Sequence, residues 1–236
     1  MIKNLLQNYI KDYKITLTEN QYEQFQKYFE LLAEWNEKMN LTAITDESGV
    51  ALKHFADSLS LLNFVDIPQN SSLADVGTGA GFPGVVLKIA RPDIKLTLID
   101  SLNKRLVFLG EVCAQLGIEA ELIHSRAENG ARDEKLRESF DFAVSRAVAR
   151  MNVLSEYCLP DVKVGGAFCA MKGAQANEEF KESLNAINTL GGKLENKYFF
   201  ELPENGGERA IAVVRKVKNT PQKYPRQSGK IKAKAL

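Results

Sequence analysis

A glycine-rich segment and an aspartate about twenty residues later carry the clearest chemical signal in the sequence. The segment reads Asp75-Val76-Gly77-Thr78-Gly79-Ala80-Gly81-Phe82-Pro83-Gly84 and lies between an expected strand and an expected helix. Glycines at such a turn let the backbone approach a ligand closely and accept positive φ angles. Asp100 ends the next expected strand, where a carboxylate can accept hydrogen bonds from the two hydroxyls of a ribose. Together they predict a site for a ligand that contains adenosine.

Two kinds of cofactor fit this pattern. The residues from Gly79 to Gly84 satisfy G-x-G-x-x-G, the fingerprint of dinucleotide-binding proteins, so an NAD-dependent oxidoreductase is one alternative. Asp75 favours S-adenosylmethionine, because an acid in the loop would crowd a pyrophosphate but can serve the positively charged end of a methionine moiety. The position of the first expected strand, about seventy residues into the chain and behind a helical region, points the same way.

Metal chemistry finds little support in the residue types. The sequence has two histidines, His54 and His124, which lie far apart. Its three cysteines, Cys113, Cys158 and Cys169, are scattered among apolar neighbours, which is typical of buried thiols rather than of a disulfide framework or a zinc site. We therefore expect no metal.

The elements that must position these residues begin with a helical region. Residues 18–39 predict an amphipathic helix with a capping box at Thr18 and Gln21. Residues 49–64 predict a second helix, and the polar stretch after Pro68 predicts a loop. We expect an N-terminal helical extension over residues 1–68.

From residue 72 onward, expected strands alternate with expected helices, the pattern of a parallel sheet covered by helices. The last two strands are joined by a short turn-like segment instead of a helix. The prediction is an α/β fold, a Rossmann-like class I methyltransferase domain over residues 69–215 with a seven-stranded, mostly parallel sheet and an antiparallel final hairpin. The expected strands are 73–76, 95–100, 120–124, 140–144, 167–172, 193–200 and 210–215, and the expected helices are 82–90, 103–116, 131–138, 150–159 and 175–190.

Charge is distributed unevenly along the 236 residues. The net charge is +1, yet residues 216–236 hold seven Lys and Arg and no acid, which leaves −6 on residues 1–215. This asymmetry predicts either a mobile basic tail that binds a polyanion or a merely solvated tail. No apolar run approaches the length of a membrane span, so we expect a cytoplasmic protein.

Several motifs in one order resemble a known family. They are Trp35-Asn36-Glu37-Lys38-Met39-Asn40-Leu41-Thr42, His54-Phe55-Ala56-Asp57-Ser58-Leu59, the loop from Asp75 to Gly84, Asp100-Ser101-Leu102-Asn103-Lys104-Arg105 and Ser145-Arg146-Ala147. The sequence is similar, over nearly its whole length, to glucose-inhibited division protein B, the family of bacterial 16S ribosomal RNA methyltransferases that make 7-methylguanosine. The resemblance implies S-adenosylmethionine as cofactor and 16S ribosomal RNA, or a small-subunit particle, as partner. It implies a cofactor pocket lined by Gly77, Phe82, Asp100, Ser101, Leu102, Ala127, Glu128 and Arg146.

Ring nitrogen 7 of guanine carries a free lone pair at neutral pH, so positioning should supply most of the catalysis. The motifs for methylation of exocyclic amines or pyrimidine carbons are absent, and Arg146 follows the fourth strand instead. We expect Arg146 to position the substrate by gripping a phosphate, the guanine carbonyl oxygen or the cofactor carboxylate. His54 and Asp57, three residues apart, form either a pair that closes the site or a structural hydrogen bond.

The expected RNA surface consists of Lys104, Arg105, Lys172, Arg209 and the tail, where Tyr224 could stack on a base. Removing residues 217–236 should then weaken RNA binding and leave cofactor binding intact. A noncatalytic RNA-binding assembly factor is the second alternative to the methyltransferase. No obligate protein partner is expected.

Overall fold

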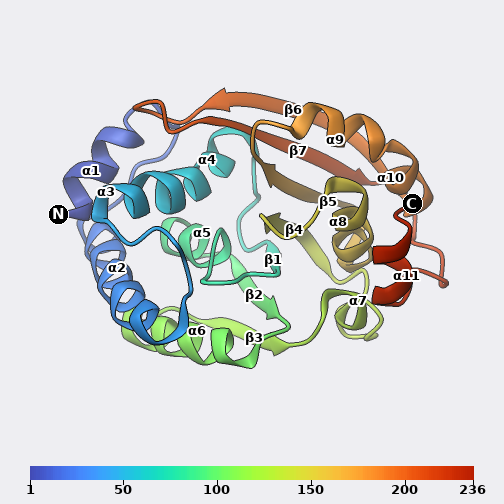
Figure 1. Ribbon diagram of the computed structural model, residues 1–236, viewed down its shortest axis with the longest axis horizontal. Coiled ribbons are helices and arrows are strands. Elements are labelled where there is room, and N and C mark those ends of the chain that lie inside the picture. The colour runs from blue at the N-terminus through green and yellow to red at the C-terminus, as the bar shows by residue number, and fades with distance from the viewer.

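The computed structural model describes residues 1–236, except for the side chain of Lys232. Helical segments precede, separate and follow the strands (Figure 1). The strands are β1 (Ser72–Val76), β2 (Lys95–Asp100), β3 (Ala120–His124), β4 (Phe140–Arg146), β5 (Val162–Lys172), β6 (Gly192–Glu201) and β7 (Glu208–Lys216). The helices are α1 (Ile2–Tyr9), α2 (Glu19–Met39), α3 (Glu47–Val50), the π-helical turn η1 (Ala51–Ala56), α4 (Asp57–Phe64), α5 (Gly84–Ala90), α6 (Asn103–Leu116), α7 (Ala127–Gly130), α8 (Met151–Cys158), the 3-10 turn η2 (Leu159–Asp161), α9 (Ala176–Glu182), α10 (Leu184–Thr189) and α11 (Ser228–Ala233).

The seven strands form one sheet in the order β3-β2-β1-β4-β5-β7-β6. The strands β1 to β5 are parallel, whereas β7 is antiparallel to both β5 and β6. This confirms the predicted fold class, including its final hairpin. The strand order reverses between β1 and β4, and ligands of doubly wound sheets bind at the carboxyl ends of strands beside such a reversal.

Two hydrophobic cores cover the two faces of the sheet. Because successive side chains of a strand point to opposite faces, Leu73 of β1 joins one core and the next residue, Ala74, joins the other. The first core also holds Phe25 of α2 and Val86 of α5, so the N-terminal helices pack on the same side as α5. One continuous core includes residues on both sides of residue 68, so the structure does not separate residues 1–68 from the sheet domain. Their assignment as a distinct extension stays a prediction.

The helix at residues 19–39 forms as predicted. Thr18 accepts a hydrogen bond from the backbone N–H of Gln21, and the Gln21 side chain accepts one from the backbone N–H of Thr18. The predicted helix at 131–138 is wrong, because α7 ends at Gly130 and successive turns follow it. The predicted helix at 175–190 is divided at Ser183, whose hydroxyl donates to the Phe180 carbonyl oxygen over 2.9 Å. Helices α1 and α11 lie outside the sequence predictions.

Residues 217–236, here called the C-terminal strap, are not the mobile tail that the sequence predicts. They pack against the body of the protein, with Tyr224 only 8% exposed and Ile231 fully buried. Figure 1 shows α11, within the strap, beside α7 and α8. Tyr224 therefore cannot stack on a base in this arrangement, and that expectation is also wrong. None of the described helices combines the length and apolar character that a membrane span requires.

Candidate functional site

A cavity of about 470 Å³ opens where β1, β2 and β4 end, beside the reversal of strand order. Such a volume suits a small ligand or cofactor. Its walls come from the glycine loop after β1, the segments that follow β2, β3 and β4, the loop before α3, and the strap. The lining residues are Leu41, Thr42, His54, Gly77, Thr78, Gly79, Ala80, Phe82, Ile99, Asp100, Ser101, Arg105, Ser125, Arg126, Ala127, Glu128, Arg146, Ala147, Val148, Tyr157 and Ser228.

Asp100 organises the floor of this cavity. Its Oδ2 accepts the backbone N–H of Gly79 at 2.9 Å, and its Oδ1 accepts the backbone N–H of Leu102 at 2.8 Å. The side chain is 2% exposed, and Arg105 adds an ion pair at 3.3 Å. Because a carboxylate offers about four lone-pair positions, these three contacts fix the orientation of the group and leave about one acceptor position, on Oδ1, for a ligand hydroxyl.

Gly77 brings the backbone to the edge of the cavity. Its φ is +74°, and a Cβ built there would lie 2.6 Å from Cγ2 of Val148, which also lines the cavity. A side chain at this position would meet both a conformational penalty and a clash. The conformation of the loop therefore requires glycine at position 77.

Asp75 lies behind the loop and does not line the cavity. Its Oδ2 accepts from the Thr78 hydroxyl and from the backbone N–H of Gly84, each at 2.8 Å. Burial raises the pKa of the Asp75 carboxyl to about 6, although both hydrogen bonds oppose the shift. The expectation that Asp75 serves the charged end of a methionine moiety is therefore wrong, because this carboxylate holds the ends of the loop together.

Arg146, the last residue of β4, is held by several groups at the cavity wall. One guanidinium nitrogen donates to Oδ2 of Asp57 at 2.9 Å, and the other lies 3.3 Å from Nδ1 of His54. The guanidinium carbon lies 5.2 Å from the centre of the Phe82 ring, within range of a cation–π contact. Asp57 also pairs with Arg209 through its other oxygen, at 3.2 Å. A buried carboxylate thus sits between two guanidinium groups.

His54 connects this cluster to the loop before α3. Burial and the nearby Arg146 charge together lower the pKa of the imidazole to about 4, so the ring is neutral at pH 7. Nδ1 lies 3.3 Å from a guanidinium nitrogen of Arg146 and 3.2 Å from the carbonyl oxygen of Lys53. Nε2 lies 2.8 Å from the Thr42 hydroxyl, and the Asn36 side chain holds Thr42 by its backbone. The ring also stacks on Phe82 at 4.5 Å.

Comparison with known proteins places the chain in a family. A family described as GidB, rRNA small subunit methyltransferase G, matches residues 21–205. A ribosomal RNA small subunit methyltransferase G from Geobacillus sp. (strain WCH70) is 53% identical over 216 residues, which is 91% of either chain. The protein of the same name from Staphylococcus carnosus (strain TM300) is 49% identical over 223 residues, 93% of this chain and 92% of that one. The chain belongs to the rRNA small subunit methyltransferase G family.

Solved structures support the fold that this family membership implies. A SAM dependent methyltransferase from Aquifex aeolicus matches 74% of this chain and 96% of its own length, with a TM-score of 0.55 and 17% identity. TrmN from Thermus thermophilus matches 68% of this chain and 48% of its own length, with a TM-score of 0.54 and 16% identity. At these identities the likeness concerns the fold alone.

The site residues expected from the methyltransferase G resemblance lie together, with one exception. Gly77, Phe82, Asp100, Ser101, Ala127, Glu128 and Arg146 all line the cavity. Leu102 is not among the lining residues. Its side chain is 43% exposed, and its backbone N–H donates to Asp100. Within the part of the chain that the structure describes, no group of three or more His, Cys, Asp or Glu side chains could hold a metal ion.

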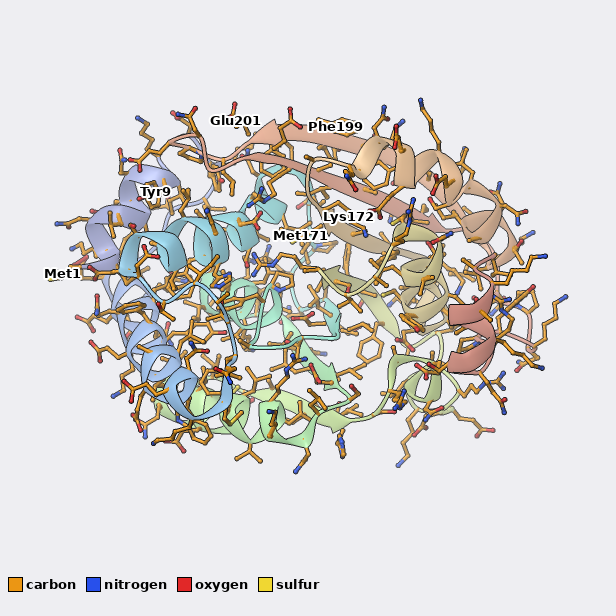
Figure 2. All side chains as sticks on the ribbon, in the orientation of Figure 1. Met1, Tyr9, Met171, Lys172, Phe199 and Glu201 are labelled. Atoms are coloured by element: carbon orange, nitrogen blue, oxygen red, sulfur yellow. The ribbon has the colours of Figure 1, made fainter. Side chains whose placement is uncertain are left out.

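Two residues of the expected RNA surface point elsewhere. Lys172 at the end of β5 pairs with Glu179 at 2.7 Å, and its side chain is only 10% exposed. In Figure 2 it lies beside Met171, inside the outline of the molecule, whereas Phe199 and Glu201 lie along the rim on β6. Arg209 pairs with Asp57 inside the cluster around Arg146. The assignment of Lys172 to an RNA surface is therefore wrong, whereas that of Arg209, whose side chain is 21% exposed, stays a prediction.

Sequence reasoning missed several residues that line the cavity of this methyltransferase G family member. Thr42 stands in a motif that carried the resemblance, so its place could have been found. Val148 follows Ser145-Arg146-Ala147 by one position. Tyr157 and Ser228 gave no local signal, because only the folded chain brings α8 and the strap to the cavity.

Proposed function

We propose that the chain transfers a methyl group from S-adenosylmethionine to ring nitrogen 7 of a guanine in bacterial 16S ribosomal RNA. The observation that carries the proposal is the cavity at the reversal of strand order, lined by Asp100 and Arg146, in a member of the rRNA small subunit methyltransferase G family. A ribosomal RNA substrate places the enzyme in the bacterial cytoplasm. Family membership removes the NAD-dependent oxidoreductase from consideration.

The cavity fits an S-adenosyl group on the evidence of its own residues. The contacts of Asp100 with Gly79, Leu102 and Arg105 leave about one acceptor position on Oδ1 for a ribose hydroxyl, and a second hydroxyl would take the position on Oδ2 that Arg105 occupies. Gly77 brings its backbone to the edge of the cavity, at a point where a Cβ would clash with Val148. Glu128, 6% exposed and also lining the cavity, can accept from an adenine amino group. We assign Gly77, Phe82, Asp100, Ser101, Ala127 and Glu128 to the cofactor.

The residues around Arg146 suit a reaction that needs alignment rather than a base. When bound, S-adenosylmethionine supplies an electrophilic methyl group on a sulfonium. The guanine nitrogen already has its lone pair, so the protein has to hold the ring in line with that group. Arg146 can donate to the guanine carbonyl oxygen and leave nitrogen 7 free to attack. The ion pair with Asp57 and the stacking of Phe82 limit the rotation of Arg146, which supports its assignment as the residue that positions the substrate.

Basic residues at the mouth of the cavity are the remaining candidates for RNA contact. Arg105 and Arg126 line the cavity, and Lys104 is exposed beside Arg105. Such side chains can neutralise phosphates of a guanosine that has been turned out of folded RNA into the site. We propose that either naked 16S ribosomal RNA or the small-subunit particle presents this guanosine.

The test is transfer of labelled methyl groups from S-adenosylmethionine to RNA. Purified protein is incubated separately with deproteinised 16S ribosomal RNA and with small-subunit particles from cells that lack the gene, and the modified base is identified after digestion. Label in 7-methylguanosine at one position supports the proposal. Label in another base removes the assigned target atom. Binding of S-adenosylhomocysteine without transfer to either substrate favours a noncatalytic RNA-binding factor instead.

A further inference from the structure

The C-terminal strap, residues 217–236, is fastened to α8 by a buried ion pair. The Arg226 guanidinium donates to Oε2 of Glu156 at 2.7 Å, and the backbone N–H of Arg226 donates to Oε1 at 2.7 Å. The Glu156 side chain is fully buried, and that of Arg226 is 22% exposed. Charge-assisted hydrogen bonds of this kind are strong when both partners are oriented. The strap is therefore fixed at Arg226.

A second set of contacts holds the strap upstream of Arg226. Arg137 donates to the backbone carbonyl oxygen of Thr220 at 2.7 Å and to that of Tyr224 at 2.9 Å. Oε1 of Glu138 accepts the backbone N–H of Thr220 at 2.6 Å. Arg137 and Glu138 thus bind the backbone of the strap, so its path upstream of Arg226 is fixed by contacts of its main chain.

The fastened strap forms part of the cavity. Ser228 lies two residues after Arg226 and lines the cavity together with Tyr157, which follows Glu156 in α8. The ion pair therefore fixes two lining residues from distant parts of the chain at once. Glu128 of α7 lines the same wall, where α7, α8 and α11 lie together (Figure 1).

We infer that the C-terminal strap is a wall of the cofactor pocket, beside Glu128 and Tyr157, and that Arg226 and Glu156 are positioning residues for cofactor binding. This rests on the proposed function, since S-adenosylmethionine is taken as the ligand. The strap confines the end of the pocket that holds Glu128, the group assigned to the adenine amino group. The expectation that residues 217–236 can be removed without affecting cofactor binding is thereby reversed.

The test measures binding of S-adenosylhomocysteine to the full chain by calorimetric titration. Arg226→Ala removes the ion pair with Glu156 and should weaken binding by about tenfold or more. Glu156 is then buried without a charged partner, and Ser228 and Tyr157 are no longer held at the cavity wall. The matched control is Arg150→Ala. Arg150 also lies at α8 and pairs with a glutamate, Glu182, at 2.6 Å, but both side chains are more than half exposed. This control should bind within about twofold of the wild-type protein, because exposed pairs contribute little.

A second variant keeps the inference testable if Arg226→Ala fails to fold. Ser228→Trp retains the ion pair and places a large side chain in the cavity, so the melting temperature should change little while affinity falls by about tenfold or more. In methyl transfer, both variants should raise KM for S-adenosylmethionine and leave kcat and KM for RNA close to wild-type values. A loss of stability alone would not raise KM for S-adenosylmethionine while leaving kcat and KM for RNA unchanged.

The outcomes separate the inference from the function on which it rests. Wild-type affinity in folded Ser228→Trp and in folded Arg226→Ala overturns the assignment of the strap as a pocket wall, while methyl transfer by the wild-type protein preserves the proposed function. Failure of the wild-type protein to bind S-adenosylhomocysteine overturns both. Partial recovery of affinity in Arg226→Lys, which keeps the charge but loses the two-nitrogen fork, supports the role of the ion pair.

Discussion

Arg146 donates a hydrogen bond to Oδ2 of Asp57 at 2.9 Å, and both side chains are largely buried. Asp57 pairs with Arg209 as well, so one negative charge lies between two positive ones. Asp57→Asn keeps the shape but removes the charge. We expect methyl transfer to fall by about tenfold or more, because a loosened Arg146 no longer aligns the substrate. The free energy of unfolding should fall by about 1–3 kcal/mol.

The control for this variant is Glu195→Gln. Glu195 pairs with Arg215 at 2.9 Å in an exposed position, where the loss of an ion pair costs less than about 1 kcal/mol. Affinity for S-adenosylhomocysteine should change little in either variant. Undiminished methyl transfer by Asp57→Asn would show that Arg146 is not held in place by Asp57.

Asp100→Ala should weaken binding of S-adenosylhomocysteine by about tenfold or more and affect RNA binding less. The change removes ribose acceptors worth on the order of 1.5–3 kcal/mol each, together with the acceptor that holds the N–H groups of Gly79 and Leu102. Asp141→Ala is the matched control, because Asp141 accepts from the Ser72 N–H at the amino ends of β1 and β4, away from the cavity at their carboxyl ends. Calorimetric titration of both folded variants decides the matter, and equal affinities would remove Asp100 from the site.

Gly77→Ala should weaken cofactor binding and lower stability more than Gly117→Ala does. Both glycines have positive φ, +74° and +63°, so each alanine pays a similar conformational cost of about 1–2 kcal/mol. Only at position 77 does the new Cβ meet a neighbour, Val148, whereas nothing lies within 4 Å at position 117. Comparing melting temperatures and affinities of the two variants isolates the contact with Val148. Identical losses would mean that the glycine loop yields freely at this point.

His54→Gln should reduce the dependence of stability on pH. The pKa of His54 in the folded protein is about 4, below its ordinary value of 6.5, because burial and the Arg146 charge disfavour the protonated ring. Its contribution to stability is therefore complete above pH 6.5 and is lost as the pH falls toward 4. Between pH 7 and pH 5 the wild-type protein should lose about 1–2 kcal/mol more than the variant. Urea unfolding at both pH values measures this, and parallel losses would mean that His54 is not buried as a neutral ring.

Local sequence signals predicted the parts of the site that depend on a strand and the turn after it. The glycine loop and Asp100 follow adjacent parallel strands, so their meeting at one edge of the sheet was predictable. The orientation of Asp75 was predictable too, because it lies two residues after Leu73 and must point to the same face, toward α5. The assignment of Asp75 to the methionine moiety relied only on its position two residues before Gly77 and overlooked that successive strand residues point to opposite faces of the sheet.

Contacts between distant segments explain what the sequence could not reveal. The excess of positive charge after residue 215 suggested solvated side chains that could bind RNA, yet Arg226 pairs with the buried Glu156. Lys172 pairs with Glu179 of α9, a contact that only the folded chain brings about. No spacing rule joins Asp57 to Arg209, because their meeting depends on the packing of η1 and α4 against the edge of the sheet.

The cavity draws residues from segments far apart in the polypeptide, since Thr42 and Ser228 line it together. During synthesis the sheet strands that carry Asp100 and Arg146 emerge long before the residues that complete the wall. A nascent chain can therefore form most of its core while its binding site is still open on one side. Until Ser228 leaves the ribosomal exit tunnel, the chain should hold its cofactor weakly, so cofactor binding has to wait for the synthesis of the strap.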